Sequence, residues 1–262
     1  MYAFEFIRPA TVEEAVAALA AEEAQALGGG QTLIPTLKQR LASPGTLVSL
    51  GGIASLKGVA VKGGELAIGG GTTHAAVARQ ARQHYPALAA LAGHIGDPAV
   101  RNRGTIGGSL ANNDPSADYP AAALASGATI VTSAREIAAD DYFQGMFTTA
   151  LEPGEIITEI RFPVPGRANY QKFVQPASRF ALVGVFVASF GDSVRVAVTG
   201  ASEDGVFRWS EAEAALSDDF RPEAVAELAA DPAGMIGDLH GSPEYRAHLI
   251  GVLTRRAVAA AA

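Results

Sequence analysis

The chain has 262 residues, of which 48% are hydrophobic and 18% are charged, so it can bury a sizeable core as one large domain or two modest ones. A formal net charge of −7, without any basic run interleaved with aromatics, argues against a nucleic-acid groove or a membrane-surface patch. The chain has no cysteine, which excludes disulfides, a thiol nucleophile and an iron–sulfur cluster on this chain, and its five histidines lack metal-ligand spacing.

The N-terminus reads as a first strand. It lacks the basic region followed by an apolar region that marks a secretory signal. No uncharged apolar stretch reaches the roughly 18 residues of a membrane span. We therefore expect a cytoplasmic protein with no membrane span and no nucleic-acid partner.

The first fifty residues read as a compact unit of alternating strands and helices. Thr11 and Glu14 have the spacing of a capping box, which places a helix start directly after Thr11. The hydrophobic pattern predicts strands at residues 4–7, 24–27 and 46–50, and helices at residues 12–20 and 33–40.

The middle of the chain mixes a hairpin with several helices. Two short apolar runs at 59–62 and 65–68, separated by two glycines, indicate a β-hairpin. A helix capped by Thr72 or Thr73 is expected to end near residue 83. Further helices are predicted at 86–93 and 120–126, strands at 128–132 and 156–162, and polar turns at 97–103 and 112–119. The sequence PVPG at 163–166 interrupts the pattern and is the predicted domain boundary.

Beyond this boundary, strands precede helices. Strands are predicted at 170–174, 182–190 and 193–199, and helices at 211–216, 222–229 and 245–261. This order favours an α+β layer. Trp209, Phe180 and Phe186 are expected in the core rather than against a cofactor.

Two glycine-rich segments stand out: GGGQTLIP at 28–35 and GTIGGSL at 104–110. Glycine lacks a Cβ and tolerates positive φ, so such segments can aim backbone N–H groups at a phosphate. Thr32, Thr105 and Ser109 add hydroxyl donors, and the lack of a lysine suits the diphosphate of a dinucleotide better than a triphosphate. Neither a convincing GxGxxG nor a GxxxxGK[ST] motif occurs, so a dinucleotide would lie in a groove between two lobes. Each segment taken alone is equally compatible with a tight turn.

Together with DPSAD at 114–118, these segments resemble motifs of a known family. GGGQTLIP, TIGGS at 105–109 and DPSAD occur in this order in the flavin-binding medium subunit of molybdenum hydroxylases, which include carbon monoxide dehydrogenase and bacterial xanthine dehydrogenase relatives. The resemblance continues through EIITEIRFP at 155–163 and through residues 170–188 and 194–216. It therefore covers nearly the whole chain.

The resemblance implies an α+β fold. It implies a two-lobed FAD-binding domain of the vanillyl-alcohol-oxidase or PCMH type, followed by a C-terminal α+β domain with an antiparallel sheet and helices. The expected divisions are an N-terminal lobe at 1–55, a second lobe at 56–163 and the C-terminal domain at 164–262.

The resemblance also implies the cofactor-binding residues. The diphosphate of FAD is expected on Gly28, Gly29, Gly30, Gln31, Thr32 and Leu33, and on Thr105, Ile106, Gly107, Gly108 and Ser109. Asp118 is expected at the ribose or adenosine side, Lys172 near the isoalloxazine, and Ile157 as a backbone contact. The residues alone leave open that Asp118 is a simple turn residue and that Lys172 is a solvated strand residue, and only proximity recommends His74 and His94. No catalytic residue and no metal ligand is expected on this chain.

The implied function is electron transfer. A large partner carries molybdopterin, a small partner carries two [2Fe–2S] clusters, and the FAD held here passes electrons to an external acceptor, as part of a dimer of heterotrimers. The alternatives are a self-sufficient flavin-dependent oxidase or dehydrogenase of the same superfamily, and a binding module that has lost its cofactor. The substrate and the acceptor are set outside this chain.

Overall fold

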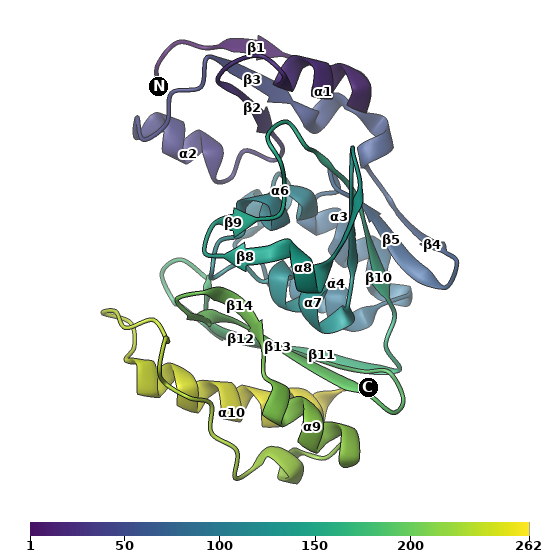
Figure 1. The fold of residues 1–262 in the computed structure, drawn as a ribbon, viewed down its shortest axis with the longest axis vertical. Coiled ribbons are helices and arrows are strands. Elements are labelled where there is room, and N and C mark those ends of the chain that lie inside the picture. The colour runs from purple at the N-terminus through teal and green to yellow at the C-terminus, as the bar shows by residue number, and fades with distance from the viewer. Residues whose placement is uncertain (262) are drawn as a thin grey trace.

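The computed structural model describes residues 1–261, whose strands form three main sheets that follow one another along the long axis of the molecule (Figure 1). The N-terminal sheet, the central sheet and the C-terminal sheet succeed one another in chain order. Helices accompany each sheet, which confirms the expected mixture of helix and sheet. Within these residues no helix combines the length and apolar character needed to cross a membrane.

The N-terminal sheet matches the predicted unit. It has the order β1-β3-β2, with β3 paired in parallel to both neighbours. Thr11 caps the first helix by accepting a hydrogen bond from the N–H of Glu14 (3.2 Å), whose carboxylate accepts one from Ala10 (2.7 Å). The elements are β1 (Glu5–Ile7), α1 (Val12–Leu19), β2 (Ala24–Leu27), α2 (Leu33–Lys38) and β3 (Thr46–Ser49), followed by the 3₁₀ turns η1 (Leu50–Gly52) and η2 (Ala54–Leu56).

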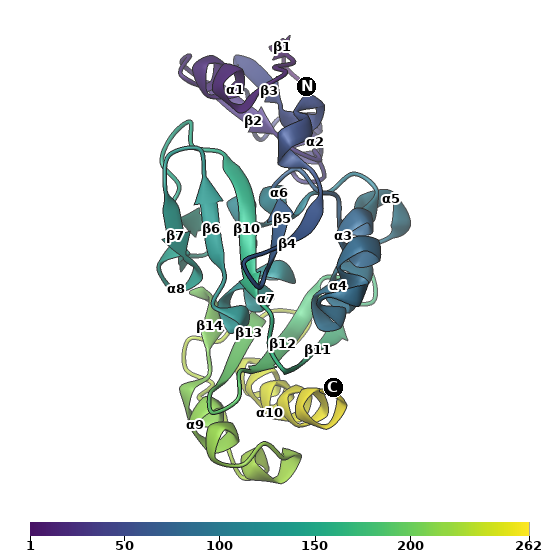
Figure 2. The same cartoon turned by 90° about the vertical axis from the view of Figure 1, so that its right-hand side faces the viewer.

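The central sheet is antiparallel and has β10 at its middle. Its order is β4-β5-β10-β6-β7, and α3 and α4 pack beside it (Figure 2). The strands are β4 (Val59–Lys62), β5 (Glu65–Gly69), β6 (Thr129–Thr132), β7 (Glu136–Ala138) and β10 (Ile157–Pro163), and β8 (Phe143–Gly145) with β9 (Thr148–Thr149) forms a separate short ribbon. The helices are α3 (His74–Gln80) with the turn η3 (Ala81–Gln83), α4 (Pro86–Gly93), α5 (Pro98–Arg101), α6 (Ile106–Asn112), α7 (Tyr119–Ser126) and α8 (Ala139–Tyr142).

The C-terminal sheet is a meander covered on both faces. Its strands are β11 (Arg167–Val174), β12 (Ala181–Ser189), β13 (Val194–Ser202) and β14 (Gly205–Arg208), followed by α9 (Ser210–Asp218), the turn η4 (Pro222–Val225) and α10 (Pro243–Ala260). Every residue of β12 is buried. Val185 and Val187 pack among side chains of α9 and α10, whereas Phe186 and Ala188 point into the core of the central part. This strand therefore joins the C-terminal sheet to the rest of the molecule.

Four local expectations were wrong. Residues 106–112 form a helix rather than a glycine loop, and the polar turn at 97–103 contains α5, which Asp97 caps through the N–H of Val100 (2.9 Å). The helix expected at 222–229 is reduced to η4. Trp209 and Phe186 are buried as predicted, but Phe180 is 47% exposed.

Candidate functional site

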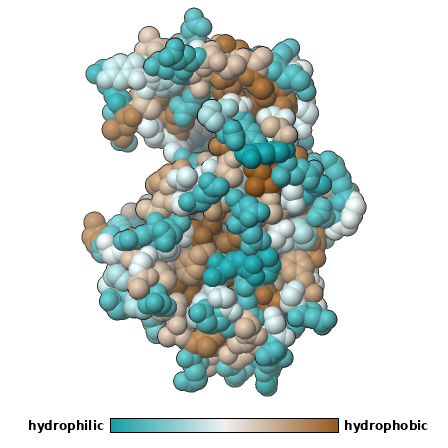
Figure 3. Space-filling view, in the orientation of Figure 1, coloured by the Kyte–Doolittle hydropathy of each residue, from teal (hydrophilic) through white to brown (hydrophobic). Residues whose placement is uncertain are grey.

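A cleft of about 1120 Å³ lies between the N-terminal sheet and the central part, and Figure 3 shows the surface hollowed at this level. Its walls come from the segment after β2, the turn before α3, the start of α6 and the loop between β11 and β12. All predicted site residues line the cleft except Ile106 and Lys172. The two glycine-rich segments, distant in sequence, therefore meet in one place.

The first glycine-rich segment turns from β2 into α2 with free backbone donors. Gly30 has a φ of +73°, a left-handed conformation that favours glycine, and its carbonyl accepts the N–H of Ile34 (3.1 Å) as the helix begins. Within residues 1–261, no group accepts a hydrogen bond from the N–H groups of residues 29–32. These N–H groups are available to an anionic ligand.

In the second segment the N–H groups of Ile106 and Gly107 are not free, contrary to the expectation of bare backbone donors at these two residues. The N–H of Ile106 donates to the carbonyl of Thr72 (3.0 Å), and that of Gly107 donates to the carbonyl of Gly70 (2.9 Å). The side chain of Ile106 is fully buried in the core. These bonds hold the start of α6 against the turn after β5, so these two N–H groups already have partners within the protein.

The glycines of both segments allow their backbones to touch neighbouring chain segments. A Cβ on Gly29 would overlap the carbonyl oxygen of Arg103. A Cβ on Gly107 would stand 2.6 Å from the carbonyl oxygen of Gly70. Real Cβ atoms do not approach oxygen this closely, so these glycines hold the walls of the cleft together rather than only facing a ligand.

The hydroxyl of Thr105 lies between the two segments. Its Oγ1 is 3.1 Å from where a Cβ on Gly28 would stand and 2.9 Å from one on Gly108. It caps α6 by accepting a hydrogen bond from the N–H of Gly108 (3.2 Å). Ser109 follows on the first turn and also lines the cleft. The second segment therefore supplies hydroxyl groups to the cleft.

A third glycine segment, at residues 69–71, was not anticipated. A Cβ on Gly70 would overlap the carbonyl oxygen of Ile157, which is the first residue of β10. Gly70, Gly71 and Ile157 all line the cleft. The signal was present in the sequence, because GGGTT at 69–73 repeats most of GGGQT at 28–32.

Asp118 lines the cleft, but its carboxylate is already engaged. The hydroxyl of Tyr170 donates to Oδ1 (2.6 Å), and Nζ of Lys172 lies 2.9 Å from the same oxygen. Burial raises the pKa of the Asp118 carboxyl above its usual value, while Lys172 and Tyr170 oppose that rise by stabilising the anion. The side chain of Lys172 is only 4% exposed, so its interpretation as a solvated strand residue is wrong.

The charge lining the cleft is mainly positive, although the chain as a whole is acidic. Three carboxylates line the cleft: Asp118 is paired with Lys172 and Glu155 with Arg135 (3.1 Å), whereas Asp114 has no ion-pair partner among residues 1–261. Four basic side chains line the cleft: Arg8, Lys57, Arg103 and Arg179. An anionic ligand is therefore favoured here over the rest of the surface.

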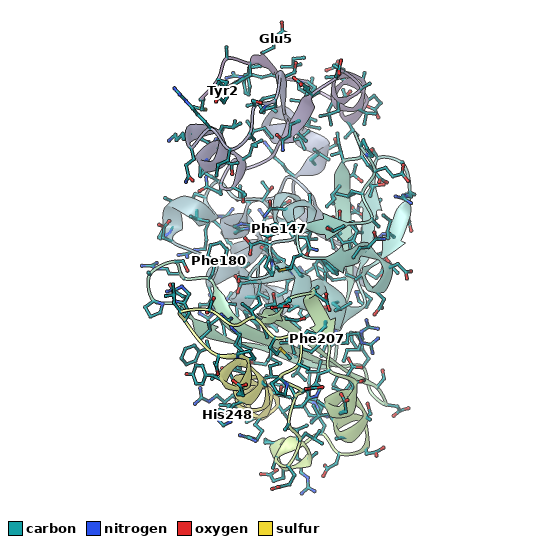
Figure 4. All side chains as sticks on the ribbon, turned by 60° about the vertical axis from the view of Figure 1, so that its left-hand side comes forward. Tyr2, Glu5, Phe147, Phe180, Phe207 and His248 are labelled. Carbon is teal, nitrogen blue, oxygen red and sulfur yellow. The ribbon has the colours of Figure 1, made fainter. Side chains whose placement is uncertain are left out.

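The loop between β11 and β12 closes one end of the cleft with Ser178, Arg179 and Phe180. The backbone of Gln175 forms two hydrogen bonds across this loop. Its carbonyl accepts a hydrogen bond from the N–H of Arg179 (2.8 Å), and the N–H of Gln175 donates to the carbonyl of Phe180 (2.9 Å). Arg179 takes a φ of +63°, which turns the chain sharply and leaves Phe180 outside the core. Figure 4 shows Phe180 at the level where the central and C-terminal parts meet.

His74 is the first residue of α3 and is buried in the cleft wall, with 5% of its surface exposed. Its Nδ1 has no hydrogen-bond partner among the residues that the structure describes. Burial, with a contribution from the charge of Arg101, lowers the pKa of His74 from 6.5 to about 4. The imidazole is therefore neutral near pH 7.

These observations fit a dinucleotide with a diphosphate. The cleft is large enough for such a ligand, and it offers free N–H groups, hydroxyl groups and basic side chains. In residues 1–261 no group of three or more His, Asp or Glu side chains gathers where it could hold a metal ion.

Comparisons with known proteins agree with this chemistry. The family described as "FAD binding domain in molybdopterin dehydrogenase" matches residues 2–165. The chain is 35% identical to the nicotine 6-hydroxylase medium subunit of Paenarthrobacter nicotinovorans, over 98% of this chain and 96% of that protein. It is 36% identical to the carbon monoxide dehydrogenase medium chain of Afipia carboxidovorans, over 97% and 95%. The structure resembles reconstituted CO dehydrogenase from Oligotropha carboxidovorans, with a TM-score of 0.88, 34% identity, and 98% and 97% of the two chains covered.

Proposed function

Because this chain belongs to the family of FAD-binding domains in molybdopterin dehydrogenases, we propose that it is the electron-transfer subunit of a molybdopterin-dependent hydroxylase or dehydrogenase. The observation that carries the proposal is the single cleft whose walls contain both glycine-rich segments. When bound, FAD supplies the exchange of one or two electrons that connects iron–sulfur clusters to an external acceptor.

The chain's own groups hold the cofactor. The free N–H groups of residues 29–32 bind the diphosphate, assisted by the hydroxyls of Thr105 and Ser109. The backbone at Ile157 contacts the cofactor, and Asp118 meets its ribose or adenosine side. Lys172 lies behind Asp118 and holds that carboxylate in its charged form, so its influence on the flavin is electrostatic.

The cleft lies between two lobes, at residues 1–55 and 56–163, in the manner of the PCMH-type FAD-binding domain. Residues 164–262 form the C-terminal domain. The partners are a large molybdopterin-binding subunit and a small subunit with two [2Fe–2S] clusters, assembled as a dimer of heterotrimers. The names of two relatives, a nicotine 6-hydroxylase and a carbon monoxide dehydrogenase, show that similar chains serve different substrates.

Purification of the chain alone and after co-expression with its neighbouring reading frames tests this function. We expect the chain alone to bind one FAD and to show the visible absorption of an oxidised flavin. No substrate of a molybdenum hydroxylase should bleach that absorption until both partner subunits are present. Bleaching by a substrate with the chain alone would favour the self-sufficient oxidase, and failure to take up FAD would refute the proposal.

A further inference from the structure

We propose that His74 is a binding contact for the dinucleotide in the cleft, donating a hydrogen bond from its imidazole to an oxygen of the ligand. His74 lines the cleft but belongs to neither glycine-rich segment. The inference rests on the proposed function, because it takes FAD as the ligand.

The backbone of His74 is held firmly between the two walls that form the central side of the cleft. Its N–H donates to the carbonyl of Gly104 (3.0 Å), and the preceding Thr73 pairs with Thr105. The ring lies against Gly104, where a Cβ would stand 2.5 Å from Nε2. Glycine at 104 therefore makes room for this imidazole directly beside the capping residue of α6.

The protein leaves the polar edge of this ring without a partner. Nδ1 of His74 is buried and forms no hydrogen bond within residues 1–261. A buried polar atom without a partner is unfavourable, and native proteins retain few of them. The tautomer of a histidine is set by the hydrogen bonds that its nitrogens make. Nδ1 is enclosed by protein atoms, whereas Nε2 is not enclosed and also forms no hydrogen bond within residues 1–261, so Nε2 is the nitrogen that can present an N–H to a ligand in the cleft.

The environment of the ring favours a neutral donor rather than a cation. Burial of the ring disfavours its positively charged form most strongly, and the charge of Arg101 contributes further repulsion. A neutral imidazole has one N–H to donate, and the oxygens of a phosphate, ribose or ribityl group accept such bonds.

A buried water is the competing explanation. The hydroxyl of Tyr119 is also buried without a partner, and the rings of His74 and Tyr119 are 5.4 Å apart. One water could serve both atoms. Tyr119 does not line the cleft, however, so the two explanations predict different effects on ligand binding.

Three matched variants of the apo chain separate these explanations: His74→Phe, Tyr119→Phe and His84→Phe, the last at an exposed histidine. The affinity for FAD is measured by flavin fluorescence, and the stability of the apo chain by urea unfolding. We expect His74→Phe to weaken FAD binding about fivefold to tenfold, the worth of one hydrogen bond, without lowering the urea midpoint of the apo chain. Tyr119→Phe and His84→Phe should bind FAD like the wild type.

Binding of FAD by His74→Phe within about twofold of the wild type overturns the proposal. An equal loss of affinity in Tyr119→Phe overturns it as well, because a shared water would then be responsible. If His74→Phe proves unstable, His74→Gln and His74→Ala are compared instead. Because His74→Gln keeps a hydrogen-bond donor, it must bind FAD more tightly than His74→Ala does. Failure of the wild type itself to bind FAD refutes the proposed function, which is a distinguishable result.

Discussion

At the scale of single residues, the buried pair of Asp118 and Lys172 is the strongest electrostatic feature beside the cleft. Lys172→Met leaves the Asp118 carboxylate buried with only the hydroxyl of Tyr170 as a donor. Removing one partner of a buried ion pair typically costs about 3–5 kcal/mol. We expect a loss of about 3 kcal/mol in the free energy of unfolding at neutral pH, measured by urea titration.

The pH dependence of this loss is a second readout. Without Lys172, the pKa of Asp118 rises further, so the native state holds a proton more tightly than the unfolded state does. The free energy of unfolding of the variant therefore increases relative to that of the wild type as the pH falls toward the raised pKa of Asp118. The double variant Asp118→Asn with Lys172→Met should recover most of the loss. A deficit that is independent of pH would contradict this account.

For His74 we expect the opposite pH dependence of the free energy of unfolding. Its pKa in the native state is about 4, against 6.5 for the free group, so between these values the unfolded state binds more protons. The contribution of the neutral His74 ring to the free energy of unfolding is therefore fully present above pH 6.5 and is lost as the pH falls toward 4. Between about pH 7 and 5, the wild-type apo chain should lose about 2 kcal/mol more than His74→Phe, measured by urea unfolding at both pH values. Parallel losses in the two proteins would show that His74 is not buried as a neutral ring.

At the scale of elements, the sequence predicted those helices and strands whose signals are local. β2 and α4 have the predicted bounds, and the capping box of α1 was identified from Thr11 and Glu14. α6 was missed because two glycines in its first turn lower its helix propensity. Its start is held by hydrogen bonds to residues 70 and 72, which are contacts that no local pattern reveals.

The candidate site shows the same division. The glycine-rich segments and Asp118 could be recognised from their motifs, but the reason for several glycines could not. Gly29 and Gly107 are needed for contacts with backbone at Arg103 and Gly70, which depend on the folded arrangement. The pairing of Lys172 with Asp118 also joins distant parts of the chain, because Lys172 lies on β11 and Asp118 directly precedes α7. Phe180 was misplaced because the turn at Arg179 has a left-handed conformation that an arginine rarely adopts.

The contact between the two glycine-rich segments predicts a contrast between neighbouring glycines. Gly29→Ala places a Cβ onto the carbonyl oxygen of Arg103, so one wall of the cleft must move. Gly28→Ala meets only the side-chain oxygen of Thr105 at 3.1 Å, which a small shift relieves. We expect Gly29→Ala to weaken FAD binding at least about tenfold, and Gly28→Ala to change it by less than about threefold, in the same fluorescence titration. Similar affinities for both variants would show that the walls do not meet as described.

Gly107 extends this reasoning to stability. From the glycine-rich motif alone, a β-branched residue at this position is expected to remove FAD and leave the fold largely intact. The structure changes that expectation, because the added Cβ would stand 2.6 Å from backbone of the central part rather than against a ligand. Gly107→Val should therefore lower the thermal midpoint of the apo chain as well as the FAD occupancy.

At the scale of the whole molecule, the three sheets have very different cores. The cluster beneath the N-terminal sheet contains only five buried residues: Ala15, Val48, Ile53, Leu56 and Ile156. The central and C-terminal clusters are much larger, and β12 contributes to both. The N-terminal unit, which stands apart at one end in Figure 1, therefore gains the least from its own packing.

This inequality predicts where FAD acts on the dynamics of the chain. The cleft has the N-terminal unit as one wall, so a bound dinucleotide connects that unit to the better-packed central part. In hydrogen–deuterium exchange of the apo chain, we expect amides of β1, β2 and β3 to exchange fastest among the strands of the three main sheets. Added FAD should slow their exchange more than that of β12 and β13, because ligand binding stabilises only the state in which the cleft is closed.

The C-terminal sheet is the internal control for this experiment, since its strands are covered by helices on both faces and do not depend on the cleft. Protection spread evenly over all three sheets would mean that the chain unfolds as one cooperative unit, and that the small N-terminal core is no weak point. Protection confined to residues 28–33 would mean that FAD orders its binding segment without holding the N-terminal unit. Slower exchange across the whole N-terminal sheet would instead show that the cofactor is a structural bridge between the N-terminal unit and the central part.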